Sequence, residues 1–259
     1  QPLRLSLDQV RVEYVALTDV AVLYVAVGGS DELVKYYISA EEWDTGLSPA
    51  PFDFSTITPV AFDCDHGYVW CSNGTHLLRY EVVLDEWSVV SSLPGGISLG
   101  AGTCMAVVGD ELYLLVGGGS TVMLVYDVEG GAWSTSSTPE PVEAYTCCCE
   151  ASGKVYVVFG GSGDLYEYDP STSTWSLLGV APTAYPVGLA YDPDRGYLWV
   201  LGRYGGLHYY DLSSGTWGSP SSQPPLYPVA PCNRLAYYGA KLYFMRGDGT
   251  RELWVIPVA

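Results

Sequence analysis

An aromatic residue flanked by apolar residues recurs six times along the chain at nearly constant spacing. The six triplets are Leu23-Tyr24-Val25, Val69-Trp70-Cys71, Leu112-Tyr113-Leu114, Val155-Tyr156-Val157, Leu198-Trp199-Val200 and Leu242-Tyr243-Phe244. Their central aromatics are 46, 43, 43, 43 and 44 residues apart. A fixed period of this length across 259 residues indicates one structure built from repeated units rather than two unrelated domains.

Two further landmarks recur within the units. A glycine stands four residues after five of the six aromatics, whereas the fifth unit has Arg203 there and its glycine doublet at Gly205-Gly206. The five glycines are Gly28, Gly74, Gly117, Gly160 and Gly247. A tyrosine followed seven residues later by a tryptophan recurs as Tyr36 and Trp43, Tyr80 and Trp87, Tyr126 and Trp133, Tyr168 and Trp175, and Tyr210 and Trp217. This order predicts four strands per unit: an apolar strand a, strand b with the triplet, strand c ending at the tyrosine and strand d beginning at the tryptophan.

The length of the repeat fits one small antiparallel sheet. Four short strands with tight turns take about 40 to 50 residues. Such a sheet cannot bury both faces alone, so the units are expected to stack around an axis as blades, with tyrosine and tryptophan filling the space between them. The glycine after strand b is expected at a sharp turn, where a positive φ costs it nothing. The sequence therefore predicts an all-β, six-bladed β-propeller of four-stranded antiparallel blades.

The two ends of the chain predict how the ring closes. The sixth unit stops after its strand c, and the segment Pro2 to Leu7 precedes the first complete unit. We expect this N-terminal strand to be the outer strand of the last blade, paired with Arg251 to Pro257. Residues 1–259 then form a single domain. Its blades are predicted at about 10–48, 58–94, 99–139, 144–182, 186–222 and 229–257 plus 2–7.

The motifs resemble the Kelch repeat. The likeness rests on Gly160-Gly161 followed by Tyr168 and Trp175, and on Gly117-Gly118 followed by Tyr126 and Trp133. It covers nearly the whole chain, is most specific in units one, three and four, and is weakest in unit six. The resemblance implies a Kelch-superfamily propeller similar to the central domain of galactose oxidase. It also implies that the d–a and b–c loops share one face of the disc, which carries binding.

The charge balance excludes some classes of binding partner. Asp and Glu number 29 against 11 Lys and Arg, which gives a formal net charge of -18. Such a surface repels phosphate backbones and anionic membranes, so we expect no nucleic-acid partner. No run approaches the roughly 18 apolar residues of a membrane span, so no membrane insertion is expected. The composition favours an extracellular, cell-surface or virion protein, although a cytoplasmic location is also compatible with it.

Seven cysteines leave at least one outside any intrachain disulfide pairing. Their spacing fits neither a zinc site nor a small disulfide framework. Cys147, Cys148 and Cys149 are consecutive, so in a strand the first and third point to one face and the second to the other. Two interpretations stay open: small buried hydrophobic residues, or a disulfide or redox role.

Residues that would carry catalysis are scattered. A copper oxidase needs converging histidine and tyrosine ligands, but His66 and His76 lie in unit two and His208 lies in unit five. The glycine-rich segments lead into strands rather than helices, so neither a phosphate loop nor a nucleophile elbow is expected. We therefore predict a non-catalytic protein with no catalytic residues, no metal and no cofactor.

The most promising polar group is a set of arginines in equivalent loops of units five and six. Arg203, Arg246 and Arg251 form a candidate anion-binding site, since guanidinium pairs with carboxylate in a bidentate manner. Tyr204 and Asp248 belong to the same loops, and Arg246-Gly247-Asp248 is an integrin-type tripeptide. Because six-bladed propellers include sialidases, the alternative function is a glycan-acting enzyme with its site in these loops.

Aromatic residues in proline-rich loops are further candidates for partner binding. They are Phe52, Phe54, Tyr185 and Tyr227. These side chains either contact a protein or glycan partner or simply pack the loops down. Asn73-Gly74-Thr75 is a candidate glycosylation acceptor. The leading hypothesis is a binding or structural module that recognises a protein, a receptor or a glycan through its loop face, as part of a larger assembly.

Overall fold

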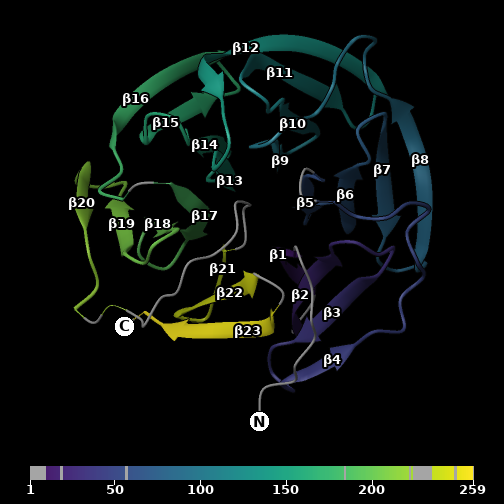
Figure 1. Ribbon diagram of the computed structural model, residues 1–259, viewed down its shortest axis with the longest axis horizontal. Coiled ribbons are helices and arrows are strands. Elements are labelled where there is room, and N and C mark those ends of the chain that lie inside the picture. Colours follow the sequence, from purple (N-terminus) through teal and green to yellow (C-terminus); the bar gives the residue numbers. More distant parts are fainter. Residues whose placement is uncertain are drawn as a thin grey trace.

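The computed structural model describes residues 10–17, 20–55, 58–183, 185–221, 223, 235–247 and 250–258. Within these residues every regular element is a strand, and the strands form six antiparallel sheets. The sheets surround a central axis as six blades, with the first strand of each nearest the axis and the last at the rim (Figure 1). No described helix is long and apolar enough to cross a membrane. The predicted all-β, six-bladed propeller is confirmed.

The first three blades each have four strands in sequence order. Blade 1 contains β1 (Val10–Leu17), β2 (Val20–Val27), β3 (Leu33–Tyr37) and β4 (Glu42–Asp44). Blade 2 contains β5 (Val60–Asp63), β6 (Tyr68–Ser72), β7 (His76–Glu81) and β8 (Glu86–Ser92). Blade 3 contains β9 (Cys104–Val108), β10 (Glu111–Leu115), β11 (Ser120–Asp127) and β12 (Ala132–Val142).

The remaining blades follow the same order. Blade 4 contains β13 (Cys147–Ala151), β14 (Lys154–Val158), β15 (Asp164–Asp169) and β16 (Thr174–Val180). Blade 5 contains β17 (Pro186–Asp192), β18 (Tyr197–Gly202), β19 (Leu207–Asp211) and β20 (Thr216–Gly218). Blade 6 contains β21 (Leu235–Tyr238), β22 (Lys241–Gly247) and β23 (Thr250–Pro257). The strand predicted to complete it, Pro2 to Leu7, lies outside the described residues.

The hydrophobic core is divided among the six blade junctions. Each of six buried clusters draws its residues from two adjacent blades, and the aromatic of every second strand belongs to one of them. The junction between the first and last blades packs Leu23 and Val25 with Tyr243 and Met245. The innermost strands β1 and β21 are also in contact. Packing between blades 1 and 6 therefore closes the ring within the described residues.

Four cysteines belong to these cores. Cys71, Cys104, Cys147 and Cys148 are all buried and pack among aliphatic and aromatic side chains. Their surroundings match the interpretation of cysteine as a small hydrophobic residue.

The Tyr-to-Trp motif is the hairpin between the third and fourth strands. In five blades the two residues pair directly across the hairpin, with ring centroids 4.9 to 5.2 Å apart. The residue two positions before each tryptophan has a left-handed φ. These residues are Glu41, Asp85, Gly131, Ser173 and Gly215. A turn of one fixed type, closed by one left-handed residue, accounts for the constant spacing of seven.

The tryptophans of this motif also join neighbouring blades. In blades 2, 3 and 4 the indole N–H donates a hydrogen bond to the outer part of the preceding blade. The three bonds are Trp87 Nε1 to the Ser48 carbonyl oxygen (2.9 Å), Trp133 Nε1 to Ser91 Oγ (3.0 Å) and Trp175 Nε1 to the Ser137 carbonyl oxygen (3.0 Å). The large ring fills the space between blades while its polar edge is satisfied across the junction.

The expected reason for the glycine after strand b is wrong at two positions. Gly117 and Gly160 do not have positive φ. A Cβ atom would instead lie 2.4 Å from the Ala101 carbonyl oxygen at Gly117 and 1.9 Å from the Ala144 carbonyl oxygen at Gly160. The inter-blade loop approaches the backbone so closely that only glycine fits. A positive φ does occur at Gly74.

Candidate functional site

The antiparallel order of the strands sorts the loops onto two faces. The turns between the second and third strands of each blade lie on the same side as the loops that connect one blade to the next. We call this side the crossover face. The turns between first and second strands, and between third and fourth strands, lie on the opposite face. Arg203, Tyr204 and Tyr185, which the sequence singled out, all belong to the crossover face.

The structure brings these three residues together with Tyr145. Arg203 and Tyr204 lie in the turn between β18 and β19, Tyr185 directly precedes β17, and Tyr145 lies in the loop before β13. The guanidinium carbon of Arg203 is 5.2 Å from the ring centroid of Tyr145 and 5.4 Å from that of Tyr204. Arg203 Nη1 also donates a hydrogen bond to the Tyr145 hydroxyl. We call these four residues the Tyr/Arg cluster.

Tyr185 links the cluster internally. Its ring centroid is 5.2 Å from that of Tyr145 and 6.1 Å from that of Tyr204. Its carbonyl oxygen accepts a hydrogen bond of 3.0 Å from the Arg203 backbone N–H. Three loop segments from two neighbouring blades are thus held together by ring packing, cation–π contacts and a backbone hydrogen bond.

The cluster combines exposed rings with a partly covered charge. Tyr185 is 46% exposed and Tyr204 is 65% exposed. Arg203 is half-buried, and its Nε atom is buried without a hydrogen-bond partner. A buried donor without a partner costs about 1 to 3 kcal/mol. The site therefore presents two aromatic surfaces beside a guanidinium whose hydrogen-bonding capacity is only partly used.

Two of the tyrosines have strained backbones. Tyr145 has φ 72 and Tyr185 has φ 56, both in the left-handed region. Tyr145 lies two residues before its innermost strand, a position that Gly102, with φ 88, occupies one blade earlier. A left-handed conformation costs a residue other than glycine roughly 1 to 2 kcal/mol. Such strain persists only where surrounding contacts hold it, and the ring contacts within the cluster supply them.

Tyr145 is the member that reasoning from the sequence missed. It lies outside the proline-rich segments and outside the arginine loops that drew attention to the other three. A signal was nevertheless present, because aligning unit four with unit three places Tyr145 where unit three has Gly102. The large aromatic residue in unit four, where unit three has glycine, is the difference that could have drawn attention to this position.

The other loop aromatics and arginines do not join this cluster within the described residues. Phe54 is only 3% exposed and packs 5.0 Å from Phe52 and 6.1 Å from Trp87, measured between ring centroids. Phe54 therefore belongs to the core between blades 1 and 2 rather than to a surface. Arg246 and Arg251 lie in β22 and β23, but their side chains are outside the described residues, as are Asp248 and Tyr227.

Asn73 lies in the turn between β6 and β7 and is exposed. Its Oδ1 atom accepts hydrogen bonds from the Thr75 backbone N–H (3.0 Å), the Thr75 hydroxyl (2.9 Å) and the His76 backbone N–H (2.8 Å). These bonds order the turn in the way that asparagine side chains commonly do. The acceptor sequence for glycosylation therefore lies in an accessible turn with a defined conformation.

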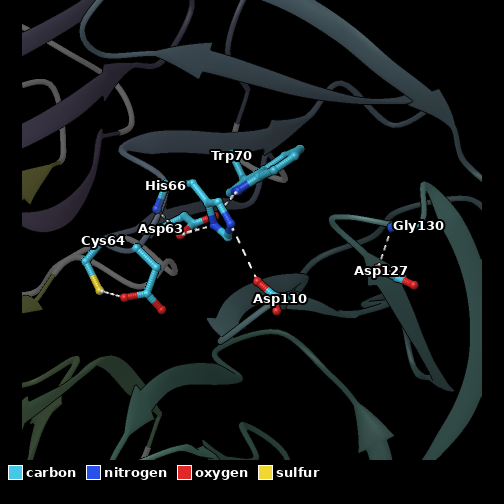
Figure 2. Close-up of polar contacts among 8 residues, drawn as sticks. Asp63, Cys64, His66, Trp70, Asp110, Asp127 and Gly130 are labelled. Atoms are coloured by element: carbon cyan, nitrogen blue, oxygen red, sulfur yellow. Dashed lines mark hydrogen bonds and ion pairs between the residues drawn. The ribbon is translucent and has the colours of Figure 1, made fainter.

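A second polar group lies on the opposite face, at the junction of blades 2 and 3 (Figure 2). The buried carboxylate of Asp63 is 2.9 Å from His66 Nδ1 and accepts a hydrogen bond of 3.2 Å from Trp70 Nε1. The other ring nitrogen of His66 is 3.5 Å from Asp110 of blade 3. An Asp–His pair of this kind can serve catalysis if a nucleophile adjoins the histidine.

The same turn occurs in blade 5 with a different cation. The fully buried carboxylate of Asp192 accepts hydrogen bonds from Arg195 Nη1 (3.0 Å) and Trp199 Nε1 (3.2 Å). Arg195 thus occupies the place of His66, and arginine cannot act as a general base near neutral pH. The shared feature is a buried aspartate that organises the turn and satisfies the tryptophan of the second strand.

Cys64 does not complete a catalytic pair with His66. Its sulfur points to Asp65 Oδ1 at 3.7 Å, away from the imidazole ring (Figure 2). Burial raises the pKa of the Cys64 thiol, and the neighbouring carboxylates of Asp65 and Asp63 raise it further. A raised pKa disfavours the thiolate that nucleophilic chemistry requires.

The third histidine lies elsewhere. His208 Nδ1 is 2.8 Å from Ser219 Oγ in blade 5, and burial lowers its pKa. The described part of the chain contains no group of three or more side chains placed to hold a metal ion.

Comparisons with known proteins support the fold alone. No family model matches the sequence, and no curated protein matches it. A structural genomics protein of unknown function from Bacteroides thetaiotaomicron is similar in structure, with a TM-score of 0.66 and 12% identity over 97% of this chain and 70% of that one. A chain of the nidogen/laminin complex has a TM-score of 0.62 and 13% identity over 87% of this chain and 84% of that one. At these identities the likeness establishes the propeller, and the Kelch family is not confirmed.

Proposed function

We propose that this propeller is a non-catalytic binding module that recognises a protein or glycan partner through the Tyr/Arg cluster of its crossover face. A β-propeller supports a binding or structural role in general, because its rigid ring holds loops from several blades on one face. The observation that carries the proposal is the cluster itself. Two strained tyrosines, Tyr145 and Tyr185, are held against Arg203 instead of relaxing into the loops.

The physical properties of the cluster suit recognition. Tyrosine offers a large contact area and has few rotatable bonds, so holding it in place costs little conformational entropy. The hydrogen bond between Arg203 and Tyr185 already fixes the two loops before any partner arrives. Such preorganisation improves affinity by removing the cost of ordering the loops on binding.

The remaining features suit a partner outside the cell. The net charge of -18 disfavours nucleic acids and anionic membranes as ligands. We propose that the protein acts on a cell surface, on a virion or in the extracellular space, where it would contribute to a larger assembly.

The test is a binding screen with a matched control on the opposite face. Purified protein is screened on a glycan array and against surface-protein preparations, and each hit is repeated with the double variant Tyr185→Ala, Tyr204→Ala. The control is Tyr238→Ala, which removes an exposed tyrosine from the end of β21. We expect the double variant to lose binding and the control to retain it.

Two results would contradict the proposal. Equal binding by wild type and the double variant would show that the partner does not use the cluster. Hydrolysis of a bound glycan, detected by chromatography of the products, would show that the protein is an enzyme.

A further inference from the structure

Arg203, like Arg79 and Lys241, forms no ion pair among the described residues, but unlike Arg79, which lies in β7, it stands in a loop beside the exposed rings of Tyr185 and Tyr204. The ion pairs formed within the described residues involve Lys35, His66, Lys154 and Arg195, and Arg203 takes part in none of them. Acidic residues outnumber basic ones 29 to 11, so carboxylates are plentiful. An arginine on a loop face of such a chain would ordinarily find one. Tyrosine rings occupy the space around this guanidinium instead.

The surroundings of Arg203 hold the guanidinium in one orientation. It contacts the rings of Tyr145 and Tyr204, and one of its amino groups donates to the Tyr145 hydroxyl. Its backbone N–H is bonded to Tyr185. Stacking on aromatic rings leaves the edge of a guanidinium, which carries its N–H donors, directed between the rings. Because Nε is buried, a carboxylate reaches the guanidinium through its two Nη amino groups, which can form a charge-assisted, bidentate pair.

Building on the proposed binding function, we infer that the Tyr/Arg cluster binds a carboxylate-bearing saccharide, such as a uronic acid residue of a glycan. The carboxylate pairs with Arg203, and the apolar face of the sugar ring packs on the exposed rings of Tyr204 and Tyr185. This arrangement uses both resources of the site, the unpaired charge and the exposed aromatic surface.

The loops around the cluster favour a saccharide over an acidic peptide. Extended peptides commonly bind by adding a strand to an open sheet edge. The loop beside Arg203 offers no such edge, because Gly205 and Gly206 are both left-handed, with φ 92 and φ 94. A peptide with several carboxylates would also meet repulsion from a protein of net charge -18, whereas one carboxylate directed at Arg203 meets much less.

The experiment compares two sugars that differ only at C6, where one carries a carboxylate and the other a hydroxymethyl group. Methyl glucuronide and methyl glucoside are titrated into the full chain, and chemical shifts or heats are recorded for wild type, Arg203→Lys and Tyr204→Ala. Loss of a bidentate, charge-assisted pair costs about 1.5 to 3 kcal/mol, which corresponds to roughly a 10- to 150-fold preference of the wild type for the uronide. We expect Arg203→Lys to lose most of that preference and Tyr204→Ala to weaken both sugars. Thermal melts verify that each variant is folded.

The outcomes separate this inference from the proposed function. Equal affinity of the wild type for both sugars, or a preference that persists in Arg203→Lys, would overturn the carboxylate inference and leave a binding role for the tyrosines. Binding of a hexaglutamate peptide without binding of either sugar would overturn the inference that the ligand is a saccharide. It would leave the proposal that the crossover face binds a partner. Ligands that bind equally well to the Tyr185→Ala, Tyr204→Ala variant would refute the proposed function itself.

Discussion

Replacing Asp192 with alanine removes the acceptor at the centre of the first turn of blade 5. The carboxylate is fully buried and accepts hydrogen bonds from four donors. Two are the backbone N–H groups of Asp194 and Arg195, at 3.0 and 3.2 Å. The others are the Arg195 guanidinium at 3.0 Å and the Trp199 indole at 3.2 Å. The substitution therefore affects a turn, a partly buried ion pair and a core tryptophan together.

The magnitude follows from where each donor lies. Trp199 is in the core, so leaving its indole N–H without an acceptor costs about 1 to 3 kcal/mol. Water can reach Arg195, which is 31% exposed, so loss of the ion pair adds only about 0 to 1 kcal/mol. The two turn N–H groups add about 1 kcal/mol more. We expect a total of about 2 to 5 kcal/mol, which overlaps the range for breaking a buried charged pair.

The assay is thermal and urea unfolding followed by tryptophan fluorescence. A loss of this size should lower the melting midpoint by roughly 10 °C in a domain of this length. Asp192→Asn keeps an oxygen acceptor and should fall between the alanine variant and wild type. Asp169→Ala is the control, because Asp169 accepts from Ser171 in an exposed turn where water can replace it. A midpoint for Asp192→Ala within about 2 °C of wild type would refute the assigned role of the buried carboxylate.

Three further predictions concern the turns and the end of the chain. Ser173 is left-handed, so Ser173→Gly should stabilise the protein by about 1 kcal/mol in urea unfolding. Gly131→Ala at the equivalent position of blade 3 should destabilise it by a similar amount. Effects of the same sign in the two variants would contradict the role given to the left-handed residue. Hydrogen bonds from the side chain and backbone of Ser213, and from Ser214, lower the pKa of Asp211 to about 2. The contribution of Asp211 to stability is therefore complete above its ordinary pKa of 3.8 and is lost as the pH falls through 2. Ser213→Ala should move this pKa toward 3.8 in a carbon-detected NMR titration, and an unchanged pKa would reject the assignment. Deletion of residues 1–7 should leave an exposed edge on blade 6 and promote concentration-dependent association, which light scattering measures. A deletion variant that stays monomeric with wild-type stability would contradict the prediction that this segment closes the ring.

The sequence predicted much of the cluster but not its assembly. Arg203 was selected as one of three arginines in loops of units five and six, Tyr204 as its neighbour in the same loop, and Tyr185 as an aromatic residue in a proline-rich loop. Tyr145 is 58 residues from Arg203 in sequence, and only the packing of blade 4 against blade 5 brings the two together. The same pattern of aromatic residues near proline also selected Phe54, which is buried. Residue type in a loop does not reveal which way a side chain turns.

What the sequence by itself determined is the number and order of the blades. Each second strand needs a large aromatic residue to fill a blade junction, and each outer hairpin needs a tyrosine opposite a tryptophan. Because both requirements are met within each blade, the residues that meet them recur in the sequence with a fixed period. The tertiary structure decided which loops meet. Gly160 is required by the approach of a loop from the preceding blade, and the Tyr/Arg cluster exists because loops of blades 4 and 5 converge on the crossover face. Contacts of this kind depend on the twist and stacking of neighbouring sheets, which no single repeat encodes.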